Sequence, residues 1–380
     1  KISKLVESLE DVQNSIGDIR GVFDGNSDDE ISGKIKGSIK PGIIKESMDT
    51  LIDSLEKEID KMESEDDKKR LSEKINLIKK TKTNILIVGS TGSGKSSTIN
   101  ALFSCENKDT DDYVEYAKVG TKASPETKAF EKYTLGNLTL WDSPGLGDSP
   151  ESDEETIETI KELLEEKDDD GNLLIDIVLL VVDGTSKDLG MSYKLLNEAL
   201  IPVFEEDTDR IIIGLNQADI AMKTGRHWDY ELNKPDEVLI KFLEEKVQSI
   251  HDRIMEDSGL DIMPIYYCAG YKEPGGEIVR PYNLSKLLMY ILEAIPEEKR
   301  IPIMEGINTE SENYRSNDDD DDYNEKIVHD FTESYDSTIS ECVDAGAEIG
   351  QFILGVPGAI VGSIIGGSIG LVKSIFEELF

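Results

Sequence analysis

The chain is short of positive charge, aromatic side chains, cysteine and histidine. Its 380 residues carry 80 acidic against 41 basic side chains, a formal net charge of −39. A chain this acidic repels nucleic-acid phosphates and anionic lipid alike, which argues against a general role in coating DNA or RNA. Any anionic ligand must therefore be held by a local arrangement of donors.

Cysteine and histidine are too scattered to suggest a structural framework. The three cysteines and three histidines are far apart, so we expect neither disulfides nor zinc, and the cysteine usage favours a reducing compartment. The chain begins with Lys1, which suggests a fragment or a trimmed protein, and what remains shows no apolar signal segment. We predict a cytoplasmic protein, with peripheral membrane attachment as an option.

Hydrophobic periodicity divides the chain. Residues 1–80 have apolar side chains at helical spacing, interrupted by a Gly- and Ser-rich stretch at 24–42, and predict an N-terminal helical region. Residues 81–295 alternate β-branched runs with amphipathic stretches, which predicts an α/β domain: a mainly parallel sheet with helices on both faces. The predicted strands are 85–88, 138–141, 175–182, 211–215 and 262–267, with a hairpin turned at Gly136-Asn137.

Two further segments follow this domain. Residues 296–330 contain five consecutive aspartates at 318–322 and predict a solvated acidic linker. Residues 331–380 predict a helical, Gly-rich segment, whose uncharged run 349–372 has glycine at every fourth position from 358 to 370. That spacing lets helices approach closely, as in membranes, although Pro357 interrupts the run. Membrane contact and a buried helix pair in a soluble domain both stay open.

A phosphate-binding loop lies at the start of the α/β domain. Residues 85–98 read ILIVGSTGSGKSST: an apolar strand, a Gly-rich loop and the start of a helix. Glycine lets successive backbone N–H groups curl around a phosphate without a Cβ clash. We expect Lys95 to reach the β- and γ-phosphates and Ser96 to bind Mg²⁺. The expected nucleotide-binding residues of this loop are Gly89, Ser90, Thr91, Gly92, Ser93, Gly94, Lys95, Ser96 and Ser97.

Two segments downstream of the loop predict contacts to magnesium and the γ-phosphate. In the sequence Asp142-Ser143-Pro144-Gly145, after the strand at 138–141, a carboxylate at Asp142 can hold a magnesium-bound water and the Gly145 amide can sense the γ-phosphate. Between the loop and this strand, Thr127 can complete the magnesium coordination. Thr121 is a rival candidate for that role, and we favour Thr127 because the hairpin strand begins just after it.

Two more segments predict a guanine base. After the strand at 211–215 comes Asn216-Gln217-Ala218-Asp219, where the Asp219 carboxylate can accept two N–H bonds from a guanine edge and Asn216 can brace the loop. After the strand at 262–267 comes Cys268-Ala269-Gly270, where a backbone N–H near Ala269 can meet the base oxygen. The predicted ligands are therefore GTP or GDP with Mg²⁺.

In this order, across residues 84–295, the motifs resemble those of the translation-factor-related GTPase superfamily. The variants GSTGSGKSS and WDSPGLGD, with the apolar tail, are most similar to immunity-related GTPases and their bacterial relatives, with dynamin-like proteins nearby. The resemblance implies a helical body built from both ends of the chain. It also exposes a departure: Gln217 stands where many relatives have Lys, which weakens guanine specificity slightly.

The expected activity is slow hydrolysis of GTP to GDP and phosphate. Lys95 and the loop amides neutralise charge, Ser96 and Thr127 coordinate Mg²⁺, and Asp142 holds it through water. Leu146 occupies the position of the water-orienting glutamine of small regulatory GTPases. The resemblance implies a GTP-dependent homodimer or oligomer that supplies the missing group, in a membrane-associated mechanoenzyme or switch. The alternative is a soluble switch that binds a protein partner; neither binds nucleic acid.

Overall fold

The computed structural model describes residues 49, 52–53, 56–57, 59–60, 65–103, 130–168, 170–204, 207–222, 227–272, 278–308, 311–331 and 333–334. Several sequence predictions lie outside these residues. They are the N-terminal helices up to residue 48, the candidate threonines Thr121 and Thr127, and the glycine-rich run 349–372.

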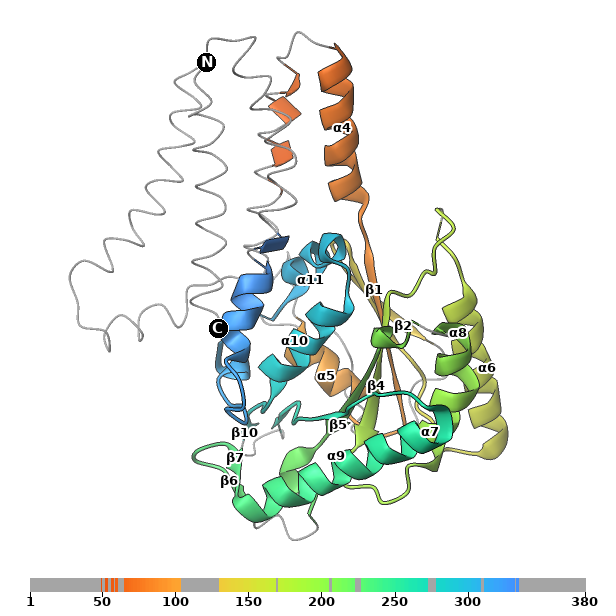
Figure 1. Cartoon of the computed structure of the whole chain (residues 1–380), viewed down its shortest axis with the longest axis vertical. Coiled ribbons are helices and arrows are strands. Elements are labelled where there is room, and N and C mark those ends of the chain that lie inside the picture. The colour runs from red at the N-terminus through yellow and green to blue at the C-terminus, as the bar shows by residue number, and fades with distance from the viewer. Residues whose placement is uncertain are drawn as a thin grey trace, which may run out of the picture.

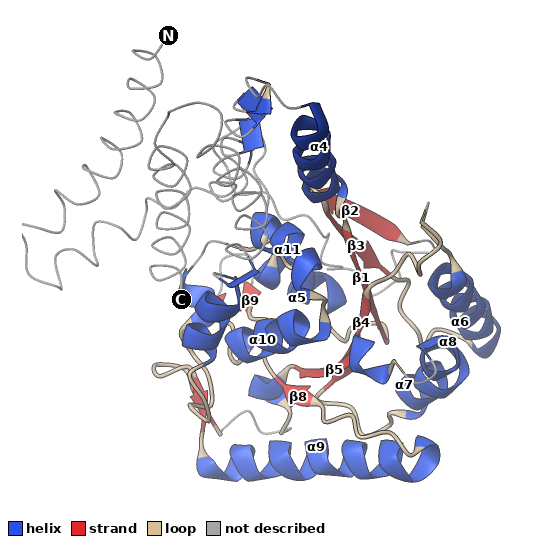
Figure 2. Ribbon diagram, turned by 45° about the horizontal axis from the view of Figure 1, so that its top comes forward, coloured by secondary structure: helices blue, strands red, loops and turns tan. Residues whose placement is uncertain are grey.

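A six-stranded sheet forms the centre of the described structure, with strand order β2-β3-β1-β4-β5-β8 (Figures 1 and 2). Its parallel strands are β1 (Thr83–Gly89), β3 (Leu138–Asp142), β4 (Ile177–Asp183), β5 (Ile211–Asn216) and β8 (Ile265–Tyr266). Strand β2 (Glu131–Leu135) is antiparallel to β3, across the predicted turn at Gly136. The α/β fold class is confirmed, although the last predicted strand is reduced to two paired residues.

Helices cover both faces of the sheet because side chains alternate along each buried strand. Ile85 and Ile87 of β1 join one core, and Leu86 and Val88 join the other. The first core is closed by α5 (Lys95–Leu102), α10 (Leu284–Ala294) and α11 (Ile301–Gly306). The second is closed by α6 (Pro150–Glu165), α7 (Gly190–Leu195), the π-helical turn η1 (Leu196–Leu200), α8 (Ile201–Phe204) and α9 (Glu237–Ser258).

The helix α4 (Glu65–Lys80) leads into β1, and short elements connect the rest (Figure 1). Two hairpins lie beside the sheet: β6 (Trp228–Asp229) with β7 (Lys234–Pro235), and β9 (Tyr271–Lys272) with β10 (Ile278–Val279). The 3₁₀ turns are η2 (Thr208–Arg210), η3 (Ala218–Ile220), η4 (Glu297–Lys299) and η5 (Ser311–Tyr314). None of the described helices combines the length and apolar character needed to cross a bilayer.

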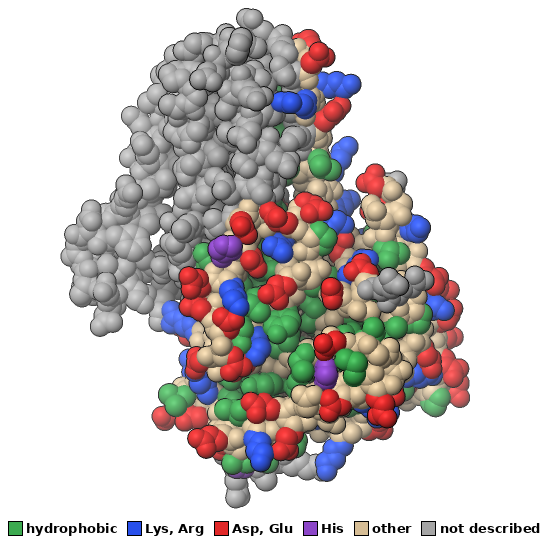
Figure 3. All heavy atoms as spheres, in the orientation of Figure 1, with side chains coloured by type: hydrophobic (Ala, Val, Ile, Leu, Met, Phe, Trp, Pro, Cys, Tyr) green, Lys and Arg blue, Asp and Glu red, His purple; other side chains and the backbone are tan. Residues whose placement is uncertain are grey.

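The segment after α10 differs from the solvated linker expected there. It forms η4, α11, η5 and a helix at 323–331, and these pack on the same core as α10. The physical reason is an apolar stripe hidden among the charges. Tyr323, Ile327 and Phe331 recur every four residues, so they share one helix face, and all three are buried. Most of the acidic groups remain on the surface, and Figure 3 shows Asp and Glu side chains spread over the described part of the face in view.

Candidate nucleotide-binding site

The loop between β1 and α5 has the backbone that its glycines permit. Gly89, Gly92 and Gly94 have φ values of 152°, 78° and 91°, which lie in the region that L side chains rarely adopt. A Cβ on Gly89 would lie 2.1 Å from the Val181 carbonyl oxygen, and one on Gly94 would lie 2.1 Å from Asn216 Nδ2. The loop therefore passes too close to β4 and β5 for any other residue at these two positions.

Lys95 begins α5 and turns its ammonium group back onto the loop. Its Nζ donates to the carbonyl oxygens of Gly89 at 3.1 Å and Ser90 at 3.2 Å. Burial lowers the pKa of Lys95, while the carboxylates of Asp142 and Asp148 act in the opposite direction. Lys95 thus lies in a desolvated position beside the loop, where attraction between its charged form and a phosphate is stronger than in water.

Ser96, the second residue of α5, lies against Asp142, the last residue of β3. Ser96 Oγ donates to Asp142 Oδ2 at 2.8 Å. The second oxygen, Oδ1, is buried and has no hydrogen-bond partner among the described residues. Burial raises the pKa of Asp142, and Lys95 and Ser96 oppose that rise. A hydroxyl beside a carboxylate with an unsatisfied buried oxygen fits Mg²⁺, which prefers oxygen ligands.

The segment after β3 docks directly on the phosphate loop. Thr91 N–H donates to the Leu146 carbonyl at 2.8 Å, and Leu146 N–H donates to the Gly89 carbonyl at 3.3 Å. A Cβ on Gly145 would lie 2.3 Å from Thr91 Oγ1, so only glycine allows this approach. Thr91 Oγ1 in turn donates to Asp148 Oδ1 at 3.3 Å. The Leu146 side chain is buried in the core and cannot orient a water molecule.

Asn216, at the end of β5, joins the phosphate loop to the loop after β8. Its Nδ2 donates to the Ser93 carbonyl at 2.9 Å, and its Oδ1 accepts from the Ala269 N–H at 2.9 Å. The side chain thus lies where a bracing residue was expected. The Ala269 N–H is already engaged, however, so a base oxygen would have to compete with Asn216 for it.

Gln217 and Asp219 complete this end of the site. Gln217 has a left-handed backbone, φ 63°, and its Nε2 donates to the Gly92 carbonyl at 2.7 Å. The amide that replaces the usual lysine therefore still reaches the phosphate loop. Asp219 is buried beside Cys268, and burial together with the Asp219 charge raises the pKa of that thiol well above its ordinary value.

One buried link in this site had no signal in the sequence. The hydroxyls of Thr98, in α5, and Tyr267, after β8, lie 2.7 Å apart, and both residues are fully buried. Gly214 of β5 makes room for the tyrosine ring, because a Cβ there would lie 2.7 Å from Tyr267 Cε1. The two residues are 169 positions apart, so no local spacing could have paired them.

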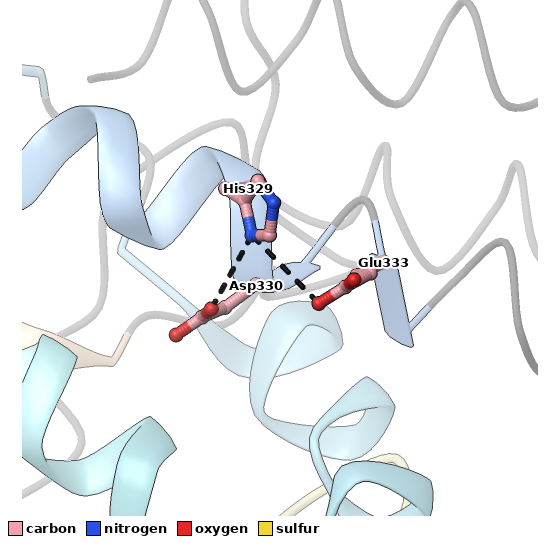
Figure 4. Close-up of side chains that lie close together, drawn as sticks. All are labelled: His329, Asp330 and Glu333. Atoms are coloured by element: carbon pink, nitrogen blue, oxygen red, sulfur yellow. Dashed lines mark ion pairs between the residues drawn. The ribbon is translucent and has the colours of Figure 1, made fainter.

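A group with metal-binding atoms lies outside this site, on the helical residues that follow Asp322. His329 Nδ1 is 3.7 Å from Asp330 Oδ1 and 3.8 Å from Glu333 Oε2 (Figure 4). His329 and Glu333 are exposed, each with 68% of its side chain accessible. The contacts are those of a solvated ion-pair cluster on one helical turn.

Part of the chain is similar in sequence to known proteins. Residues 48–164 match the family model of interferon-inducible GTPases. A segment of 87 residues is 38% identical to mouse interferon-gamma-inducible GTPase 10; it covers 22% of this chain and 19% of that protein. The match therefore spans about a fifth of the curated relative.

Similar solved structures include Toc33 from Arabidopsis thaliana with Mg²⁺ and GMPPNP, at 18% identity and a TM-score of 0.35, covering 63% of this chain and 92% of that one. Another is a GTP-binding protein from Sulfolobus solfataricus with GDP, at 20% identity and a TM-score of 0.31, covering 60% and 55%. Because these scores are low, the fold rests on the strand order of the chain itself. The family match confirms, over residues 48–164, the resemblance to immunity-related GTPases expected from the motifs.

Proposed function

We propose that this protein binds guanine nucleotide with Mg²⁺ and hydrolyses GTP to GDP and phosphate. The observation that carries the proposal is the buried group at the phosphate loop. Lys95 is desolvated there, and Ser96 is bonded to an Asp142 carboxylate whose second oxygen has no partner among the described residues. Phosphoryl transfer to water needs positioning and neutralisation of charge, and this arrangement offers both.

Each residue of the site has a distinct role in this scheme. Lys95 neutralises the β- and γ-phosphates, and the loop amides surround them. Ser96 and Asp142 would hold Mg²⁺, with Thr127 proposed as a further ligand. The bound cation would neutralise charge that develops on the phosphate oxygens. Gly145 brings its backbone against Thr91, so that a γ-phosphate at the loop would meet the segment that begins there.

Base recognition is assigned to Asp219, because its carboxylate can accept the two N–H groups of the guanine edge. Calorimetry should detect binding of GDP with Mg²⁺ and at least tenfold weaker binding of ADP, a difference of about 1.4 kcal/mol. Asp219→Asn should lose GDP and gain XDP, since xanthine carries an oxygen where guanine has an amino group. Asp209→Asn removes a charge from an exposed turn and serves as the matched control. Equal binding of GDP and ADP would refute the assignment.

We also propose that a second subunit supplies the group that orients the attacking water. Support comes from the buried Leu146 side chain, which leaves that position without a polar group. Turnover per subunit should then rise with protein concentration and reach a plateau. A flat response over a hundredfold range of concentration would refute dimer-dependent hydrolysis.

Membrane attachment is proposed on the sequence of residues 349–372 alone. Under this proposal the protein sediments with liposomes when GTP is bound, and deletion of residues 349–380 abolishes the sedimentation. The alternative, a soluble switch with the run packed as core, predicts instead that the same deletion lowers thermal stability without a change in lipid binding.

A further inference from the structure

The aspartate run at 318–322 has no part in the proposed reaction, yet its first member is buried against α10. The Asp318 side chain is 5% exposed. Its Oδ2 accepts from Lys286 Nζ at 2.6 Å and from Asn283 Nδ2 at 3.1 Å, and its Oδ1 accepts from the Tyr323 hydroxyl at 2.8 Å. Burial alone would raise the pKa of Asp318, but the Lys286 ammonium outweighs it and holds that pKa below the ordinary value.

Asn283 carries this contact to the guanine end of the sheet. The residue is fully buried in a left-handed conformation, φ 55°. Its Oδ1 accepts from the Asp318 N–H at 2.8 Å, and its Nδ2 donates to the Tyr266 carbonyl at 3.0 Å. Tyr266 is the last residue of β8, two positions before Cys268. Asp318 thus holds the Asn283 amide group in the orientation that supports the end of this strand.

The loop 268–270 depends on the same stretch of backbone. Cys268 and Tyr282 exchange two backbone hydrogen bonds, Cys268 N–H to the Tyr282 carbonyl at 3.0 Å and Tyr282 N–H to the Cys268 carbonyl at 2.9 Å. Residues 282 and 283 therefore support the backbone of the loop 268–270. A shift of Asn283 would move that loop, because a buried hydrogen-bonded network has few alternative arrangements.

The later aspartates of the run make different contacts. Asp319 pairs with Lys234 and is 72% exposed, and Asp321 pairs with Lys326 of the helix that follows. These two side chains therefore reach lysines on either side of the run and not Asn283. Asp320 also pairs with Lys286, at 3.3 Å, and its N–H donates to Asp318 Oδ1 at 3.2 Å, but its side chain is 69% exposed. The hydrogen bonds that tie the run to Asn283 are made by Asp318.

We infer that Asp318 is a positioning residue for guanine binding, which acts through Asn283 on the loop 268–270 and joins the base pocket to the helix at 323–331. This inference rests on the proposed function. The buried end of the acidic run then supports the loop 268–270, and its exposed end leads into the helix at 323–331. The guanine base, rather than the phosphates, is the part of the ligand whose binding depends on it.

The test compares Asp318→Asn with Asp321→Asn, which removes the same charge from the same run. With GTP as substrate, Asp318→Asn should raise KM about tenfold, equivalent to about 1.4 kcal/mol, while kcat stays within about twofold. Asp321→Asn should leave both constants unchanged. The split between KM and kcat matters because general destabilisation would not spare the phosphate chemistry while weakening the base contact.

A second variant guards against misfolding, since Asp318→Asn leaves the largely buried Lys286 ammonium with only its longer pair to Asp320, at 3.3 Å. Asp318→Asn combined with Lys286→Met has no such charge and should show the same rise in KM. Equal KM values for Asp318→Asn and Asp321→Asn, or a fall in kcat that follows the melting temperature, would overturn the inference. Failure of the unaltered protein to bind GDP in calorimetry would instead refute the proposed function, so the two failures are distinguishable.

Discussion

Removing the Thr98 hydroxyl should destabilise the protein more than removing the Tyr267 hydroxyl, although the two share one hydrogen bond. Thr98 Oγ1 donates its proton to the Gly94 carbonyl at 2.8 Å, so the Tyr267 hydroxyl must be the donor in the 2.7 Å contact between them. Tyr267→Phe therefore leaves Thr98 with its other bond intact. We expect it to lower the free energy of unfolding by about 1 kcal/mol, the net value of one buried hydrogen bond.

Thr98→Val should cost more, because it leaves the buried Tyr267 hydroxyl without an acceptor. The expected loss is about 2 kcal/mol, within the range for an unsatisfied buried donor. The Gly94 carbonyl does not add to this, since it also accepts the Thr98 backbone N–H at 2.9 Å. The double variant carries no unpaired polar group and should be more stable than Thr98→Val alone by about 1 kcal/mol.

Urea unfolding followed by tryptophan fluorescence measures all three variants, because Trp141 and Trp228 both lie in the α/β domain. Recovery of stability in the double variant is the result to look for. Simple addition of the two single losses, to about 3 kcal/mol, would show that the hydroxyls do not interact as described and would refute the reasoning.

Three other predictions concern the loops and one histidine. Gly145→Ala should lower kcat about tenfold with GDP affinity unchanged, because its Cβ would lie 2.3 Å from Thr91 Oγ1; single-turnover phosphate release measures this, and normal turnover would contradict it. Ser96→Ala should weaken GDP binding about tenfold when Mg²⁺ is present and should change it little when EDTA removes the metal. Titration of GDP in the two buffers measures both affinities. Hydrogen bonds that the His251 ring donates to the carboxylates of Asp261 and Asp252 raise the pKa of His251 above 6.5. The folded protein therefore stabilises the charged form of His251. This contribution to folding stability is complete below pH 6.5 and disappears as the pH rises through the pKa of His251 in the folded state. His251→Gln should make the melting temperature depend less on pH between pH 6 and 8.5 than it does in the unaltered protein. An unchanged slope would count against the contribution of His251.

The sequence pattern predicted those strands and loops whose structure depends on neighbouring residues along the chain. The apolar runs of β1, β4 and β5 are buried on both faces, so they stand out as strands, and Gly89 and Gly94 indicate a loop that leaves no space for a Cβ. Composition failed at residues 318–322, because a run of like charges does not reveal that one member is buried beside a lysine 32 positions earlier.

Motif order predicted two loops for a guanine base but not the contacts within them. A backbone N–H near Ala269 was expected to meet a base oxygen, and the structure shows that the Ala269 N–H donates to Asn216 Oδ1. Such a contact joins residues 53 positions apart and depends on where β5 and β8 end in three dimensions. Spacing along the chain carries no information about which of several nearby amides is already bonded.

The placement of Asn216 has a consequence for binding kinetics. One buried side chain fixes the Ser93 carbonyl and the Ala269 amide to each other, so the halves of the pocket that would meet phosphate and base are aligned when the chain folds. The entropic cost of ordering the two halves is met during folding, so it does not reduce the free energy of nucleotide binding. Nucleotide association should then follow a single phase that is linear in concentration, without a slow step in which two separate loops find each other.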